Sequence, residues 1–205
     1  MNGFKSYRLF TGKSVILMIE ILLAAAFACI AAARIVIACS GDIEVWDFLR
    51  FIGEVMWISC IFVVMCWLFN ANLRSSPGYR FFHSLPNASS DFKRALLTAD
   101  IYLLIGTAIF AAAELLLFGN TSQMFVGLTL FMLGWINLFG NMGMWFRTIP
   151  FYVVGFMEGF LNGITDGEEI PDEIKLVMFA VCAVFCAVGV LYSTINTKRI
   201  WEREK

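Results

Sequence analysis

The 205-residue sequence lacks the residue patterns that most enzyme active sites require. It has one histidine, His83, so neither an HExxH pair nor a histidine cluster for zinc can form. It has no GxSxG nucleophile elbow. The segment Thr11–Ser14 (TGKS) matches only the end of a phosphate-binding loop, because Tyr7 stands where the first glycine is needed. We therefore expect no intrinsic enzymatic activity and no bound metal or cofactor, with any ATP and Mg²⁺ bound by another chain.

Charged residues are also scarce, at 15% of the chain against about 25% in soluble domains. Hydrophobic residues make up 60%, and the mean hydropathy is +0.79. A soluble core of this size cannot take up so many apolar side chains, so lipid must cover much of the surface. We expect the lipid bilayer, and not nucleic acid, to be a partner of this chain.

Cysteines are few, and their positions do not suit a disulfide framework. Five of the six fall inside apolar runs, and only Cys39 lies near a predicted outer surface. We expect them to act as helix-packing residues. The five are Cys29, Cys60, Cys66, Cys182 and Cys186.

Six continuous apolar runs approach or exceed the length of about 20 residues that a helix needs to cross a bilayer. They lack the alternation of apolar and polar residues that β-barrel strands show. Within lipid each segment must satisfy its own backbone hydrogen bonds, which a helix does. The sequence therefore predicts an all-α integral membrane protein with six transmembrane helices in one domain spanning 1–205. The runs are Val15–Ala38, Phe51–Asn70, Leu96–Phe118, Gln123–Phe139, Met144–Leu161 and Ile174–Ile195.

Basic residues are distributed unevenly between these runs. With the N-terminus inside, the outer side keeps only Arg34, Arg50 and Lys175. By the positive-inside rule, both termini are expected in the cytoplasm of a multi-pass protein of the cell (plasma) membrane, and we expect a bacterial one. The inner segments hold Lys5, Arg8, Lys13, Arg74, Arg80, Lys93, Arg94, Arg147, Lys198, Arg199, Arg203 and Lys205.

Both chain ends are predicted to lie at the inner membrane surface. In Met1–Lys13, aromatic residues recur at helical spacing with basic residues between them. This pattern favours an amphipathic helix in the headgroup region, with a disordered basic tail as the alternative. Residues 196–205 form a basic cytoplasmic tail.

We interpret Glu20, Arg34, Glu54, Glu114 and Glu158 as intramembrane charges. Such groups are costly in lipid and tend to face protein or water. We expect Arg34 to pair with Glu54. We expect Glu114 and Glu158 to line an outer vestibule, and Glu20 to lie deepest in the membrane. The alternative is that residues near helix ends reach the interface and stay hydrated.

The fourth and fifth predicted spans carry features suited to close helix packing or to a pathway. Small residues at four-residue spacing let helices approach closely, either within the subunit or at a subunit or gating contact. These are Gly155, Gly159 and Gly163 on the fifth span. Polar and aromatic side chains at comparable depth on the fourth span are Trp135, Asn137 and Asn141.

The connection Arg74–Arg94 (RSSPGYRFFHSLPNASSDFKR) is too long and too patterned for a simple turn. Apolar residues at three-residue spacing give a short helix one apolar side, and Pro86 ends it. That side consists of Tyr79, Phe82 and Leu85, and Arg80, His83 and Ser84 lie off it. The product is a short helix parallel to the membrane, with a charged face toward the cytoplasm.

This arrangement resembles the membrane (permease) subunits of type-2 ATP-binding cassette (ABC) transporters, in which a coupling helix joins the second and third spans. The matching residues are Arg80–Leu85 for the coupling helix, the Leu85-Pro86 pair that follows it, and Lys93 and Arg94 at the opening of the third span. The segment Met1–Lys13 is similar to the connecting helix of that family. A departure is the polar segment 87–90, where the family often has a basic residue.

The resemblance implies a dimer of permease subunits, as a homodimer or a heterodimer, driven by separate ATPase subunits that push on the coupling helices. It implies export of a peptide, lipid or other amphipathic substrate. The ATPase-coupling interface would comprise Tyr79, Arg80, Phe81, Phe82, His83, Leu85 and Pro86. Within it, Phe81, Phe82 and Leu85 would fill an apolar cleft while Arg80 finds a carboxylate.

Two other functional classes remain open at this stage. One is the substrate-binding membrane component of an uptake system, since Ala24, Ala28 and Ala32 give the first span a small-residue face for another membrane subunit. The other is a membrane assembly or immunity protein without a transport role.

Overall fold

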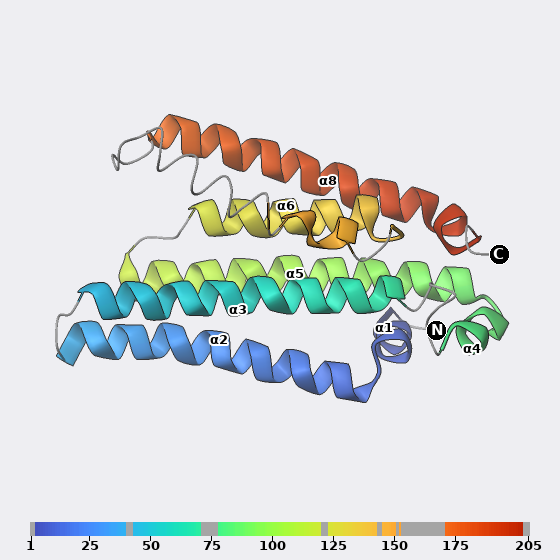
Figure 1. Cartoon of the computed structure of the whole chain (residues 1–205), viewed down its shortest axis with the longest axis horizontal. Helices are drawn as coiled ribbons and strands as arrows, with labels where there is room; N and C mark the ends of the chain where they lie inside the picture. The colour runs from blue at the N-terminus through green and yellow to red at the C-terminus, as the bar shows by residue number, and fades with distance from the viewer. Residues whose placement is uncertain are drawn as a thin grey trace.

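The computed structural model describes residues 3–39, 43–70, 78–119, 123–142, 145–150, 152 and 171–202, and the regular structure within these ranges is helical (Figure 1). This confirms the all-α prediction. The helices are α1 (Gly3–Thr11), α2 (Lys13–Cys39), α3 (Ile43–Asn70), α4 (Tyr79–Ser84), α5 (Ala88–Phe118), α6 (Gln123–Phe139) and α8 (Asp172–Glu202).

Four described helices are long and apolar enough to cross a membrane, as in an integral membrane protein. They are Lys13–Cys39, Phe48–Asn70, Ala88–Phe118 and Glu173–Glu202, which match the first, second, third and sixth predicted spans. Helix α6 has 17 residues, about 25 Å of helix, which is short of the roughly 30 Å hydrocarbon layer. The fifth predicted span lies mostly outside the described residues.

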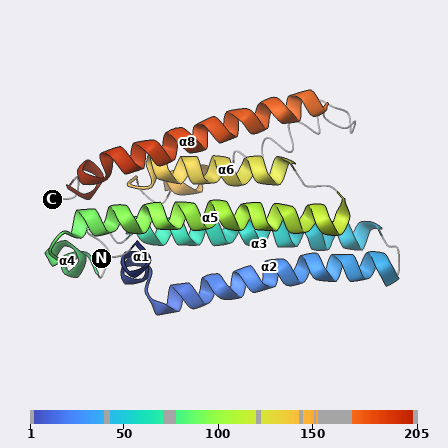
Figure 2. The same cartoon turned by 180° about the vertical axis from the view of Figure 1, so that it is seen from behind.

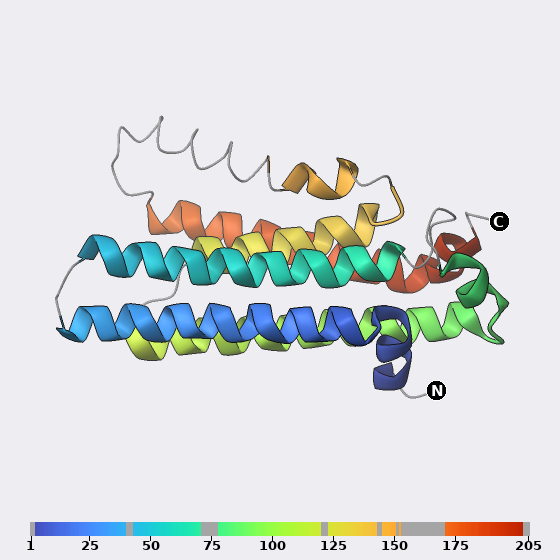
Figure 3. The ribbon, with the colours of Figure 1, turned by 60° about the horizontal axis from the view of Figure 1, so that its bottom comes forward.

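The long helices run side by side, with α3 and α5 between α2 and the α6–α8 pair (Figures 1 and 2). The most extensive contacts are those of α6 with α8 and of α2 with α3. Helix α1 packs across α5, and α1, α4 and the C-terminal end of α8 gather at one end of the bundle (Figure 3). We call this end the α4 end.

A left-handed glycine makes the bend between α1 and α2. Gly12 has φ +74° and donates its N–H to Arg8 O at 3.1 Å, which closes the end of α1. A residue with a side chain rarely adopts this conformation, so glycine is favoured there. The TGKS segment is therefore explained by a helix end and a turn.

Small residues set the spacing of α6 and α8. A Cβ atom added to Gly134 would lie 2.8 Å from Phe185 O, and one added to Gly189 would strike the Gly134 backbone. Close approach of this kind is typical of helices packed in lipid, where apolar burial alone does not hold helices together. Glycine is therefore required at both positions for α6 and α8 to pack as they do.

Large apolar side chains remain exposed along the outside of the long helices. Leu116 on α5 is 85% exposed and Ile195 on α8 is 75% exposed. In a soluble protein, extended apolar surface of this kind marks an interface. Around a bundle of spanning helices, it is the surface that lipid covers.

Candidate functional site

The short helix α4 begins where glycine allows an aromatic ring to fold back on the chain. A Cβ atom on Gly78 would lie 2.6 Å from the Phe82 ring, and Phe82 donates its N–H to Gly78 O at 2.9 Å. Leu85, in extended conformation, ends the helix before Pro86. The observed helix, Tyr79–Ser84, agrees with the predicted Arg80–Leu85 within one residue at each end.

An aromatic cluster fixes α4 to three other helices. Phe82 lies against Phe10 of α1 with ring centroids 5.0 Å apart, and His83 stacks on Trp201 of α8 at 4.1 Å. Phe92 of α5 contacts both Phe10 and Trp201, at 5.6 and 5.0 Å. We call these five residues the aromatic cluster. These ring contacts therefore link α4 directly to α1 and α8, and through them to α5.

The side of α4 that faces away from the bundle presents a cation beside an aromatic ring. Arg80 is exposed, and Phe81 is 57% exposed. Pro86, just beyond the helix, is exposed as well. A rigid helix that offers an arginine and an aromatic ring has the residue types that dominate protein–protein interfaces.

Four of the predicted interface residues are half-buried against the protein itself, whereas Arg80, Phe81 and Pro86 are exposed. Phe82 and Leu85 are half-buried against the core, and His83 is half-buried against Trp201. Tyr79 is half-buried and stacks on His83 at 4.1 Å. The apolar side that the three-residue spacing predicts therefore lies toward the protein's own aromatic cluster, and the partner-binding role of these residues stays a prediction.

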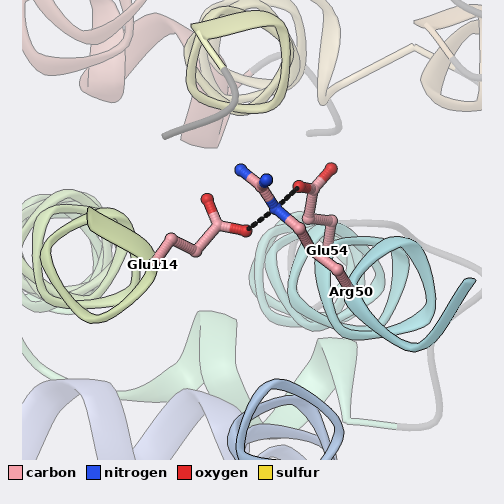
Figure 4. Close-up of polar contacts among 3 residues, drawn as sticks. All are labelled: Arg50, Glu54 and Glu114. Carbon is pink, nitrogen blue, oxygen red and sulfur yellow. Dashed lines mark hydrogen bonds and ion pairs between the residues drawn. The ribbon is translucent and has the colours of Figure 1, made fainter. Parts of the chain in front are cut away.

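At the opposite end of the bundle, one guanidinium forms ion pairs with two carboxylates (Figure 4). Arg50 Nε on α3 donates to Glu114 Oε1 on α5 at 3.0 Å, and it lies 3.4 Å from Glu54 Oε1 on α3. Glu114 is completely buried, whereas the side chains of Arg50 and Glu54 are 11% and 16% exposed. The Arg50 guanidinium also lies over the Phe118 ring at 5.5 Å. We call Arg50, Glu54 and Glu114 the acidic triad.

The acidic triad replaces the predicted pair of Arg34 with Glu54. Arg34 is exposed on α2, and the ion-pair partner of Glu54 is Arg50, four residues earlier on α3. The prediction also placed Glu114 in an open vestibule, whereas its side chain is covered between α3 and α5. Glu20 is exposed on α2, and its expected depth in the membrane stays a prediction.

A second buried polar contact joins α5 and α6 in the bundle interior. Asn137 Nδ2 donates to Asp100 Oδ1 at 2.9 Å and to Leu133 O of its own helix at 3.0 Å. Asp100 and Asn137 are each 1% exposed. Sequence reasoning had singled out Asn137 but not Asp100. The signal was a lone acid in an apolar run, since Asp100 lies within the predicted third span, Leu96–Phe118.

Two further polar side chains act at the α4 end. Asn141 Nδ2 donates to Ile200 O at 3.0 Å and so ties the end of α6 to α8. Arg147, which is buried, donates from Nη1 to Asn70 Oδ1 at 2.7 Å and to Cys66 O at 3.2 Å. These contacts place both residues in helix packing at the end of α3 and α8.

Of the remaining predicted site residues, one makes a hydrogen bond and the others lie outside the described residues. Trp135 donates from Nε1 to Phe146 O at 2.7 Å. Glu158 and the glycines Gly155, Gly159 and Gly163 lie outside the described residues, so the packing and gating predictions for them stay predictions. No three His, Cys, Asp or Glu side chains of the described ranges are grouped as metal ligands.

Comparison with known proteins gave no match: no family model fits the sequence, and no curated protein or solved structure is significantly similar to it.

Proposed function

We propose that this chain is the permease subunit of a type-2 ABC transporter that exports a peptide, a lipid or another amphipathic molecule. In this proposal six helices cross the cell membrane, both termini lie in the cytoplasm, and the α4 end faces the cytoplasm. A second permease subunit completes the pathway, and separate subunits bind and hydrolyse ATP.

The observation that carries the proposal is the construction of α4. It is a six-residue helix between two candidate spans, α3 and α5, and it exposes Arg80 and Phe81. Its inward side is held by Phe10 and Trp201 through rings 4.1–5.0 Å away. An exposed helix needs no such anchoring to connect two spans, whereas a helix that transmits force does.

The distribution of charge supports the proposed orientation. Helix α1, the start of α5 and the end of α8 meet at the α4 end, and all of them are basic. Basic residues at short inner loops keep that side of a membrane protein in the cytoplasm. They are Lys5, Arg8, Arg80, Lys93, Arg94, Lys198 and Arg199.

The proposed mechanism follows from the contacts of α4. When the ATPase subunits close on ATP, they push on Arg80 and Phe81. Because Phe82 and His83 are packed on α1 and α8, the push moves those helices together with α4. The permease pair then changes between inward and outward access, which corresponds to a rigid-body switch at packed interfaces.

Copurification tests the proposal. The native complex is extracted in mild detergent and its ATPase content is compared with that of the double variant Arg80→Ala/Phe81→Ala. Two interface anchors worth about 2 kcal/mol each predict a loss of bound ATPase well above tenfold. The matched control is Phe4→Ala/Lys5→Ala, which removes an exposed aromatic ring and a cation from α1 at the same end and should leave ATPase binding unchanged.

The outcome separates the candidate functions. Copurification of no ATPase with the wild-type chain would contradict the proposal. A small molecule retained by the purified monomer, without ATPase, would favour the substrate-binding component of an uptake system.

A further inference from the structure

The buried contact between α5 and α6 has more hydrogen-bond acceptors than donors. Asn137 has two amide hydrogens, and they are used by Asp100 Oδ1 at 2.9 Å and Leu133 O at 3.0 Å. This leaves Asp100 Oδ2 and Asn137 Oδ1, both covered from solvent and both without a hydrogen-bond donor among the described residues. An ionised carboxylate can only accept, so an ionised Asp100 leaves both oxygens unsatisfied.

Within the described ranges Asp100 makes no ion pair with a cation. Arg94, six residues earlier on α5, lies 3.9 Å from Asp91, and Arg50 is engaged by Glu54 and Glu114. Helix α6 has no titratable residue. On α8 the thiol of Cys186 lies within electrostatic range of Asp100.

The other helices packed on α5 offer no compensating charge either. Tyr7 of α1 and Cys60 of α3 interact with each other, and both are uncharged at neutral pH. The charged residues of α1 and α2 are all exposed; they are Lys5, Arg8, Lys13, Glu20 and Arg34. A lone carboxylate in lipid is costly, and the cost is higher when one of its oxygens has no donor and no cation lies beside it.

The oxygen count decides which ligand the contact would take. Metal cations such as Ca²⁺ and Mg²⁺ need six or more oxygens, whereas at this contact only Asp100 Oδ2 and Asn137 Oδ1 lack a hydrogen-bond donor among the described residues. A proton needs one oxygen to carry it and one to accept the hydrogen bond. Asp100 Oδ2 and Asn137 Oδ1 meet that requirement, and they belong to two side chains already joined by a hydrogen bond.

We propose that Asp100 and Asn137 form a proton-binding site in the membrane interior, in which Asp100 Oδ2 carries the proton and donates it to Asn137 Oδ1. The acid and the amide are then joined by two parallel hydrogen bonds, Nδ2–H to Oδ1 and O–H to Oδ1. This site is independent of the proposed ATPase partner.

Release of the proton is tied to separation of α5 from α6. When the O–H bond breaks, the proton passes to water and a carboxylate stays behind. That carboxylate is stable only when water reaches it, and both oxygens are covered while the helices are packed. Protonation therefore favours the closed contact, and opening of the contact favours release.

Infrared spectroscopy of the full-length chain in lipid nanodiscs tests the site. The wild-type protein is labelled with ¹³C at the aspartate side-chain carboxyl and compared with unlabelled protein at neutral pH. The proposal predicts a carbonyl band of a protonated carboxylic acid that shifts with the label and is missing from Asp100→Asn. The control Asp91→Asn, at the more exposed start of α5, should retain the band. Absence of an isotope-shifted band from the wild-type protein overturns the proposal, as does its persistence in Asp100→Asn.

A second variant tests the pairing without altering the acid. Asn137→Leu removes the acceptor of the Asp100 proton, so the isotope-shifted band should move in frequency. An unchanged band position in this variant overturns the assignment of Asn137 as partner.

Discussion

The imidazole of His83 lies flat on the indole of Trp201, with centroids 4.1 Å apart and planes inclined by 10°. This contact joins α4 to the last turns of α8, 118 residues later in the sequence. Phe10 reaches the same indole from α1 at 5.9 Å. The connection between the second and third spans is therefore held by both ends of the described chain.

Removal of the indole should loosen α4. Trp201 is 4% exposed, so Trp201→Ala leaves a cavity, and we expect a loss of about 3–5 kcal/mol of unfolding free energy. Thermal unfolding in detergent measures it. The matched control is Trp145→Ala, which should lower the unfolding free energy only a little because Trp145 is 82% exposed. Equal losses in the two variants would contradict the anchoring role of Trp201.

The acidic triad should respond to the loss of its only cation. Arg50→Ala leaves Glu54 and Glu114 without their guanidinium, and breaking a buried ion pair costs roughly 3–5 kcal/mol. A double-mutant cycle of Arg50→Ala with Glu114→Ala should give a coupling of roughly 1–3 kcal/mol.

The exposed arginine on α2 is the control for that cycle. Arg34→Ala combined with Glu54→Ala should give additive losses, because Arg34 is exposed and Glu54 pairs with Arg50. A substantial coupling between Arg34 and Glu54 would show that the original sequence-based pairing was right.

The packing of α6 on α8 should tolerate no side chain at its closest point. Gly189→Ala places a Cβ atom against the Gly134 backbone, and we expect overpacking to cost about 1–3 kcal/mol. Gly127→Ala is the control on α6, since its Cβ atom would meet nothing closer than 3.9 Å. Thermal unfolding compares the two, and a destabilised Gly127→Ala beside an unaffected Gly189→Ala would refute the predicted contact.

The inward side of α4 should behave differently from its outward side. Phe82→Ala combined with Leu85→Ala removes side chains packed on the core, so it should lower the unfolding temperature. The outward pair Arg80→Ala/Phe81→Ala should leave that temperature nearly unchanged. If the inward variant is fully stable, then Phe82 does not anchor α4.

Composition and the proline that ends α4 predicted much of the fold. Long apolar runs can only be helices in lipid, and four of the six predicted runs lie in described helices long enough to span. Pro86 marked the end of α4 because proline limits backbone conformation locally. Neither argument depends on what the helix touches.

Side-chain partners were less predictable because they depend on helix ends and on packing. Helix α3 begins at Ile43, not at Phe51, so Arg50 lies inside the helix and reaches Glu54 at four-residue spacing. Periodicity separated the two sides of α4 but could not say which one faces Trp201. That choice is made by tertiary packing between residues distant in the sequence.

The central claim is that an ATPase subunit binds α4, and site-specific photocrosslinking in cells tests it most directly. A photoreactive amino acid at position 81, the exposed aromatic of α4, should give an adduct that mass spectrometry identifies as an ABC ATPase, whereas the same group at position 4 on α1 should not. An adduct at position 81 with lipid alone, or labelling of this position from outside the cell, would contradict the account.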